Sequence, residues 1–347
     1  METETAPDVE RTDRMLRRAE HVDGRFMNPV PTTVGEWSTM WKALPLYFNN
    51  KEEKVPARPL GPFRTDTAVY RTNPKSGLRV TWIGHSSMLL EMDGLRVLID
   101  PVWDERASPV RWMGPRRFFA APLRLEELPP IDIVLVSHDH YDHLGESTVR
   151  TLTGLASMKD AEWVTSLRVG EVLEQYGVKR RHITELDWTE SVGDESLKIT
   201  ALPARHFSGR GMFNRFETLW SSFVLKGREH NVYFGADSGL WPGFEEIGRE
   251  YGPFDLTMLE IGSYNELWEA IHLGPDNAVR AFEALGGEGL LMPIHWGLFD
   301  LALHSWRQPM ERFMQLVGDK RIRVWAPEPG RPTEVVEGVE VRSDWWR

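Results

Sequence analysis

The sequence predicts an α/β protein in which two strand-rich halves carry appended helices. Short runs of β-branched and aliphatic residues, separated by turn residues, follow one another from Leu78 onward. Beyond residue 138, strand-like and helix-like patterns alternate. Hydrophobic residues make up 41% of the 347 residues, which is enough for a large packed core and excludes general disorder.

The first 65 residues differ in character from the rest of the chain. Residues 1–20 are charged throughout, with some helical character, and lack the apolar stretch of a secretory signal peptide. Residues 21–65 are rich in proline and contain the aromatic residues Trp37, Trp41, Tyr47 and Phe48. We therefore expect residues 1–65 to form an arm and an extended segment laid across a main domain of residues 66–347.

Strands are expected where apolar runs are bounded by turn residues. In the first half these runs are LRVTWI at 78–83, SMLLEM at 87–92, LRVLID at 95–100 and IDIVLVS at 131–137. In the second half they are HITEL at 182–186, LKITALP at 197–203, SSFVLK at 221–226, NVYFGAD at 231–237, DLTMLEIG at 255–262 and LLMPIHW at 290–296. Helical patterns cover 166–177 and 275–287, the second ending in two glycines.

Composition limits the functions that the chain can have. It contains no cysteine, so any metal must be held by histidine and carboxylate side chains. The net charge of −11 disfavours binding to nucleic acid, and no apolar stretch is long enough to span a membrane. We expect a cytoplasmic protein; the Pro- and Trp-rich residues 28–63 fit either peripheral contact with a membrane or burial against the main domain.

Potential metal ligands follow the apolar run at 131–137. They are His138, His140, Asp142 and His143. Alternate residues of an extended segment point the same way, so His138 and His140 can converge on one point. The next turn can bring Asp142 and His143 to a second point nearby. Four solvated loop residues are the alternative, but the apolar run before them and Leu144 after them are typical of a buried site.

The pattern H-x-H-x-D-H at 138–143 resembles the signature of the metallo-β-lactamase superfamily. In that superfamily a third histidine, an aspartate and a last histidine follow at the ends of later strands, as His206, Asp237 and His295 do here. Further phrases resemble the N-acylphosphatidylethanolamine-hydrolysing phospholipase D group, from about Asn28 to about Phe299. Among them are TWIGHSS, DPVW, SHDHYDHL, FGADSG and IHWGLF.

The resemblance implies an αββα sandwich of two mixed β-sheets flanked by helices, the metallo-β-lactamase fold. It also implies a dinuclear zinc centre, phosphodiesterase activity, a hydrophobic access groove and often a homodimer. Carried over to this chain, it assigns one metal to His138, His140 and His206, the other to Asp142, His143 and His295, and a bridging position to Asp237.

The ligand types explain the chemistry independently. Imidazole and carboxylate suit zinc, and manganese or iron would fit the same donors. Two divalent cations about 3.5–4 Å apart lower the pKa of a water toward neutrality, so that it can attack phosphorus as hydroxide. They also offset the negative charge on the phosphoryl oxygens. We expect a phospholipase D-type phosphodiesterase acting on N-acylphosphatidylethanolamine-like lipids or a smaller phosphodiester, with Asp237 taking part in the reaction.

His272 is the second expected catalytic residue. It aligns with a family histidine near the substrate phosphate, which suits protonation of the leaving group or contact with the phosphate. A structural loop histidine is the alternative. The family usually has glutamine just before this histidine, whereas this chain has Ile271.

Other polar residues near strand ends are candidates for supporting roles. His85, Asp100 and Ser137 could orient the ligands. Arg116 and Arg117 could bind a phosphate, with solvated or structurally paired arginines as the alternative. The stretches 211–220 and 263–268 suit either the walls of a lipophilic channel or the core.

Two further functions remain open from the sequence. One is hydrolysis of a lactone or of another soluble phosphoester, because one fold can host many chemistries. The other is a non-catalytic binding protein that uses metals for folding. The complete ligand set argues against the second.

Overall fold

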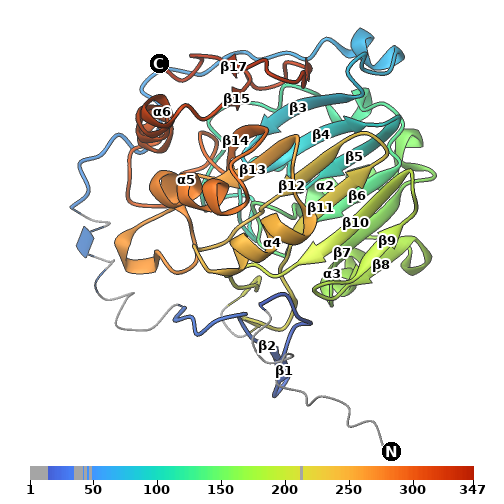
Figure 1. Ribbon diagram of the computed structural model, residues 1–347, viewed down its shortest axis with the longest axis horizontal. Coiled ribbons are helices and arrows are strands. Elements are labelled where there is room, and N and C mark those ends of the chain that lie inside the picture. Colours follow the sequence, from blue (N-terminus) through green and yellow to red (C-terminus); the bar gives the residue numbers. More distant parts are fainter. Residues whose placement is uncertain (1–14, 35–41, 43–44, 47–48, 212–213) are drawn as a thin grey trace, which may run out of the picture.

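The computed structural model describes residues 15–34, 42, 45–46, 49–211 and 214–347. Two β-sheets are stacked with helices on their outer sides (Figure 1), so the predicted αββα sandwich is confirmed. Residues 1–14 of the expected arm, and the aromatic residues Trp37, Trp41, Tyr47 and Phe48, lie outside the described residues. Residues 15–20, which were expected to have helical character, form no helix.

The first sheet has seven strands in the order β16-β3-β4-β5-β6-β7-β8. The strands are β3 (Leu78–Gly84), β4 (Ser87–Met92), β5 (Leu95–Ile99), β6 (Ile133–Val136), β7 (Glu162–Ser166), β8 (Ile183–Leu186) and β16 (Thr333–Glu334). Pairing is antiparallel from β16 to β5 and parallel from β5 to β8.

The second sheet has six strands in the order β14-β13-β12-β11-β10-β9. The strands are β9 (Ser191–Gly193), β10 (Leu197–Leu202), β11 (Ser222–Gly227), β12 (Asn231–Phe234), β13 (Leu256–Glu260) and β14 (Leu290–Ile294). Pairing is parallel from β14 to β12 and antiparallel from β12 to β9. Each predicted strand run forms a strand; β7, β9 and β16 are additional.

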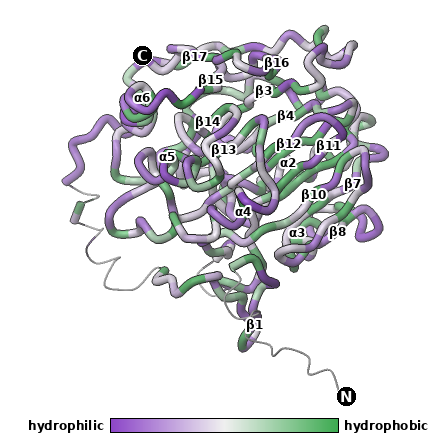
Figure 2. Tube along the Cα trace, viewed as in Figure 1, coloured by the Kyte–Doolittle hydropathy of each residue, from purple (hydrophilic) through white to green (hydrophobic). Residues whose placement is uncertain are grey.

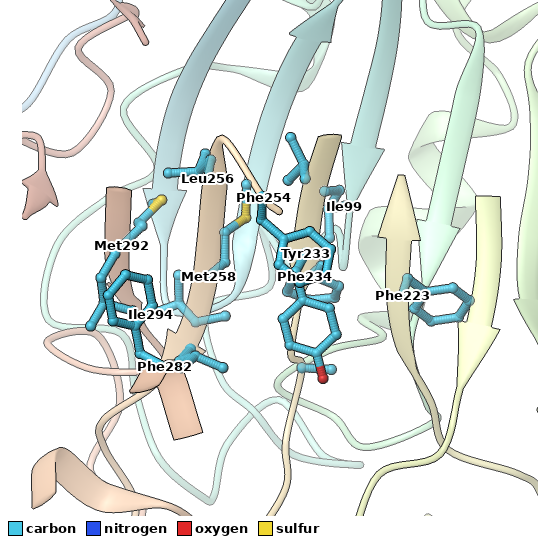
Figure 3. Close-up of a cluster of buried hydrophobic side chains, with 14 of the residues drawn as sticks. Ile99, Phe223, Tyr233, Phe234, Phe254, Leu256, Met258, Phe282, Met292 and Ile294 are labelled. Carbon is cyan, nitrogen blue, oxygen red and sulfur yellow. The ribbon is translucent and has the colours of Figure 1, made fainter. Parts of the chain in front are cut away.

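Alternation of side chains along the strands builds two apolar layers. On β5, Val97 and Ile99 pack into the cluster between the sheets, and Leu98 packs into the cluster on the opposite face. Figure 3 shows part of the first cluster, in which Phe223 and Phe234 are fully buried. Burial of each such side chain contributes about 1.5–3 kcal/mol to the free energy of unfolding. Figure 2 shows the hydrophobic stretches of the central strands.

Helices cover the outer face of each sheet. α2 (Glu146–Leu152) and α3 (Val169–Gln175) pack on the first sheet, and α4 (Gly243–Tyr251), α5 (Gly274–Ala284) and α6 (Gln308–Lys320) lie on the side of the second (Figure 1). The patterns at 166–177 and 275–287 predict α3 and α5. The helix α5 ends before Gly286, whose φ of 111° suits the expected glycine stop.

Segments near both ends of the described chain pack on the loops of the second sheet. The short hairpin of β1 (His21–Val22) and β2 (Arg25–Phe26) leads to Asn28, whose Nδ2 donates to the carbonyl of His206 at 2.8 Å. Near the other end, the ring of Trp345 stacks on that of Trp296 with centroids 5.1 Å apart. Both contacts lie at loops that follow strands of the second sheet.

No helix within the described ranges has the length and apolar character needed to cross a bilayer.

Candidate metal centre

The predicted ligands gather at one edge of the sandwich because they follow the carboxyl ends of strands. His138 follows β6, His206 follows β10, Asp237 follows β12 and His295 follows β14 directly. Because β10, β12 and β14 run in the same direction, their ends meet at the same edge. The structure thus brings together all seven residues of the predicted ligand set.

The first group of donors consists of three histidines. His138 Nε2 lies 2.9 Å from His140 Nδ1, and His206 Nε2 lies 3.3 Å from that same atom. Donors of a tetrahedral zinc site with bonds of about 2.0–2.1 Å are separated by about 3.3 Å. The three nitrogen atoms therefore lie as close together as ligands of one cation do.

The second group surrounds the carboxylate of Asp142. Its Oδ2 lies 3.2 Å from His295 Nε2 and 3.7 Å from His143 Nε2. His85 Nε2 also lies 2.9 Å from this oxygen, so His85 joins this group directly and can hold Asp142 or act as a ligand itself.

Asp237 lies between the two groups. Its Oδ2 is 3.6 Å from His206 Nε2 and 3.1 Å from His295 Nε2, while its Oδ1 is 3.2 Å from His143 Nε2. This position matches a carboxylate shared by two cations.

Buried polar atoms without partners provide a test of whether the residues fit metal ions. Asp237 Oδ1 and His143 Nε2 are buried, and neither forms a hydrogen bond of good geometry with the described residues. Leaving a buried polar atom unsatisfied costs about 1–3 kcal/mol, so a cation at this point would remove a real penalty. The donor set of imidazole and carboxylate is also one that zinc, manganese or iron accepts.

Hydrogen bonds on the far side of the rings fix their orientation. His143 Nδ1 donates to Asp100 Oδ2 at 2.6 Å, and His206 Nδ1 donates to the carbonyl of Ile271 at 2.9 Å. Ser137 Oγ lies 2.9 Å from His138 Nδ1 and donates to Asp100 Oδ2 at 2.7 Å. Each of these rings therefore presents Nε2 to the centre.

The electrostatics of the centre leave Asp237, His138 and His206 in the protonation states that metals require, whereas His295 holds a proton that a metal would displace. Burial lowers the pKa of His138 and His206 well below the usual value, so these rings are neutral. Burial alone would raise the pKa of Asp237, but His143 and His295 outweigh it and hold that pKa well below its usual value. Asp237 in turn raises the pKa of His295 to about 10 against the effect of burial. The carboxylate is ionised and attracts positive charge.

A further buried carboxylate, which the sequence analysis did not identify, lies beside the metal centre. Glu260 at the end of β13 is fully buried, and its Oε2 accepts a hydrogen bond from His272 Nδ1 at 2.6 Å. Its Oε1 accepts from the backbone N–H groups of Ser238 and Leu273 at 2.8 and 3.1 Å. Burial raises the pKa of Glu260, and His272 opposes this rise. Because Nδ1 of His272 is bound to Glu260, Nε2 is the ring nitrogen of His272 that can contact a molecule in the cavity described below.

Strained backbone occurs at the strand ends that carry these groups. The φ angles of His85, Asp100 and His295 are 56°, 39° and 61°, a left-handed conformation that costs about 1–3 kcal/mol per residue. Gly262 lies so close to His295 that a Cβ would be 2.0 Å from the histidine carbonyl oxygen. The packing around His295 thus depends on a glycine.

A cavity of about 440 Å³ opens above the centre. Polar groups of the centre line it, namely His140, Asp142, Asp237, His272 and His295. Apolar side chains line its other walls, among them Val34, Phe207, Trp268, Ile271 and Leu301, and Arg215 contributes a charge. The stretches 211–220 and 263–268 thus each supply part of the wall.

The structure does not bring Arg116 to this cavity. Its exposed guanidinium pairs with Glu105 at 2.8 Å. Arg117 donates to the carbonyls of Phe119 and Trp103 at 2.9 and 3.1 Å, so it braces its own loop.

The chain is similar to known proteins over most of its length. Residues 95–296 match the model of the beta-lactamase superfamily domain. An uncharacterized protein of Mycobacterium tuberculosis is 43% identical over 293 residues, which are 84% of this chain and 77% of the relative. N-acyl-phosphatidylethanolamine-hydrolyzing phospholipase D 1 of Caenorhabditis elegans is 33% identical over 254 residues, which are 70% of each chain.

Solved structures show the same fold at low identity. The isothiocyanate hydrolase from Delia radicum gut bacteria superimposes with a TM-score of 0.59 and 19% identity, over 74% of this chain and 99% of that one.

Proposed function

We propose that this member of the beta-lactamase superfamily is a dinuclear phosphodiesterase that cleaves N-acylphosphatidylethanolamine-like phospholipids. The chain is a metal-dependent hydrolase and belongs to the group of N-acylphosphatidylethanolamine-hydrolysing phospholipases D. The observation that carries the proposal is the sharing of Asp237 by two donor groups beside a cavity with apolar walls. Phosphodiester hydrolysis needs charge stabilisation at two oxygens, which two adjacent cations supply.

Both metal sites can be named from the donor groups. His138, His140 and His206 would hold one divalent cation, and Asp142, His143 and His295 the other, with Asp237 in contact with both. When bound, the cations would make a water acidic at neutral pH and offset the negative charge of the phosphoryl oxygens.

The cavity suits a phospholipid headgroup with an attached acyl chain. Phe207, Trp268 and Leu301 offer apolar surface to the chain, and Arg215 offers positive charge in the cavity wall. Ile271 lines the same wall, so the headgroup meets an apolar side chain there.

His272 is placed to serve the leaving group. With Nδ1–H donating to Glu260, the protonated ring carries its second proton on Nε2, next to the cavity. Attack by water at phosphorus breaks the bond from phosphorus to the ethanolamine oxygen. The departing oxygen takes a proton from His272, and the attacking water releases a proton to the solvent, from which His272 is reprotonated.

Product analysis with labelled water tests the proposal. The metal-loaded protein is supplied with N-acylphosphatidylethanolamine vesicles in ¹⁸O-water, and the products are identified by mass spectrometry. We expect N-acylethanolamine without label and phosphatidic acid carrying one ¹⁸O. His138→Ala should lose metal and turnover together, whereas His182→Ala should keep both because His182 pairs with Glu162, outside the metal centre.

Other outcomes would contradict the proposal. Turnover of a lactone panel without turnover of bis-p-nitrophenyl phosphate would indicate a lactonase. A protein that binds two metals but hydrolyses neither class would be a metal-stabilised binding protein.

A further inference from the structure

The loop after β5 contains a tight β-ribbon formed by residues 105–117. Arg117 N donates to the carbonyl of Glu105, and Ala107 N donates to that of Pro115, both at 3.0 Å. Gly114 closes the tip with a φ of 96°, and a Cβ there would lie 2.6 Å from Ser108 Cβ. Hydrogen bonds at its base and close packing at its turn therefore give this ribbon a fixed conformation.

Two apolar side chains project from the tip of the 105–117 ribbon. Trp112 is 76% exposed and Met113 is 57% exposed, the highest values among the large hydrophobic side chains in the described ranges. Single exposed apolar residues are common, but two adjacent ones on a hydrogen-bonded ribbon form a surface suited to an apolar partner. Tryptophan in particular favours the boundary between water and lipid, because its ring is both apolar and a hydrogen-bond donor.

The charge of the ribbon is opposite to that of the whole chain. Between residues 105 and 117 there are four arginines and one glutamate, whereas the chain carries a net charge of −11. Arg111 directly precedes Trp112 in the sequence. Arg116 pairs with Glu105 and Arg117 donates to carbonyls of its own loop, so the exposed Arg111 is the arginine that complements the negative surface of anionic phospholipids.

The ribbon also stands next to the metal centre. Ala107 lines the cavity above the metals. Tyr141 lines both that cavity and a neighbouring one of about 570 Å³, to which Arg106 and Arg111 contribute. A surface in contact with the ribbon would therefore lie close to the substrate entrance.

We propose that the 105–117 ribbon docks the enzyme on an anionic phospholipid bilayer, with Trp112 and Met113 inserted at the interface and Arg111 on the headgroups. Docking in this way brings the cavity to the lipids that it takes. The inference rests on the proposed function for its substrate, since a phospholipid in a bilayer is reached only from the membrane surface.

Vesicle co-sedimentation of the full-length, metal-loaded protein tests the docking. The vesicles are phosphatidylcholine alone or phosphatidylcholine with a minority of phosphatidylglycerol. The double variant Trp112→Ser/Met113→Ser is compared with Val336→Ser/Val339→Ser, whose side chains are 43% and 49% exposed outside the ribbon. We expect wild type to bind the anionic vesicles, the ribbon variant to bind at least about tenfold more weakly, and the control to bind as wild type does.

Turnover of soluble bis-p-nitrophenyl phosphate separates this inference from the proposed function. Equal turnover by wild type and the ribbon variant, with slower turnover of vesicle substrate by the variant, supports the docking. A wild type that binds vesicles through the ribbon but hydrolyses no diester also supports docking, while overturning the proposed function. Absence of vesicle binding by wild type, or equal binding by the ribbon variant, overturns the docking. So does a change from dimer to monomer in the ribbon variant alone, because the ribbon would then contact a second copy.

Discussion

Replacing Asp100 by asparagine should weaken one of the two proposed metal sites while leaving the proposed ligands themselves unchanged. Asp100 is fully buried and accepts hydrogen bonds from His143 Nδ1 at 2.6 Å, Ser137 N at 2.7 Å and Ser137 Oγ at 2.7 Å. In Asp100→Asn, one carboxylate oxygen becomes an NH₂ group. Asparagine keeps the shape of the side chain and tolerates the left-handed φ of 39° at this position.

The expected loss follows from these contacts. Ser137 N keeps its acceptor, and the Ser137 hydroxyl can rotate to accept from the new amide. His143 Nδ1–H, however, faces a donor in place of an anionic acceptor, and the loss of a charged hydrogen bond costs about 1.5–3 kcal/mol. The alternative tautomer would put the proton on the Nε2 that faces the metal. We therefore expect metal affinity at the Asp142–His143–His295 site to fall by about ten- to hundredfold.

Competition between the metal-free protein and a zinc chelator measures this loss. Asp93→Asn is a matched control, because Asp93 also accepts from a histidine Nδ1 at 2.6 Å and also has a positive φ, 52°, but its partner is His230. Binding of two zinc ions by Asp100→Asn with wild-type affinity, or an equal loss of affinity in Asp93→Asn, would contradict this role of Asp100. Far-UV circular dichroism of both variants shows that the fold is intact.

Three further predictions concern proton handling, pH dependence and the core. Glu260→Gln should lower kcat by about ten- to hundredfold while metal content stays at the wild-type level, because His272 loses its anionic partner; metal loss in this variant would show a structural role. Burial lowers the pKa of His304 from 6.5 to about 4, so the unfolded chain binds more protons between these values. The free energy of unfolding should therefore fall as pH drops from about 6.5 to about 4, by up to about 3 kcal/mol, and His304→Asn should reduce this fall in urea titrations of the metal-free protein. Phe223→Ala should lower the free energy of unfolding by about 3–5 kcal/mol, since this fully buried ring lies between the sheets; a loss below about 1 kcal/mol would contradict that packing.

Much of the fold and of the ligand set could be predicted from local patterns. Apolar runs located the strands, and residues such as His138 and His295 follow those runs directly. Their meeting also needs the two sheets, which contain β6 and β14 respectively, to stack with these strand ends at the same edge. The helices α2, α4 and α6 were not predicted because their positions depend on packing against the finished sheets.

Glu260 shows what a local pattern cannot reveal. In the sequence it is one polar residue in the run DLTMLEIG, and nothing nearby indicates a histidine partner. Its role arises because β13 lies between β12 and β14, which places Glu260 between the loops that carry Asp237 and His295. Arg116 illustrates the opposite error: a sequence-based candidate for the site pairs at the surface with Glu105.

The contacts of Asn28 and Trp345 have a consequence for anyone shortening this protein. Both residues lie in segments outside the family match at 95–296, yet Asn28 binds the carbonyl of His206, a proposed metal ligand, and Trp345 stacks on Trp296, the neighbour of the proposed ligand His295. Trimming either segment would free a loop whose correct placement the catalyst needs. The segments that contain Asn28 and Trp345 therefore hold these loops in place, and a functional protein needs them in addition to the αββα sandwich.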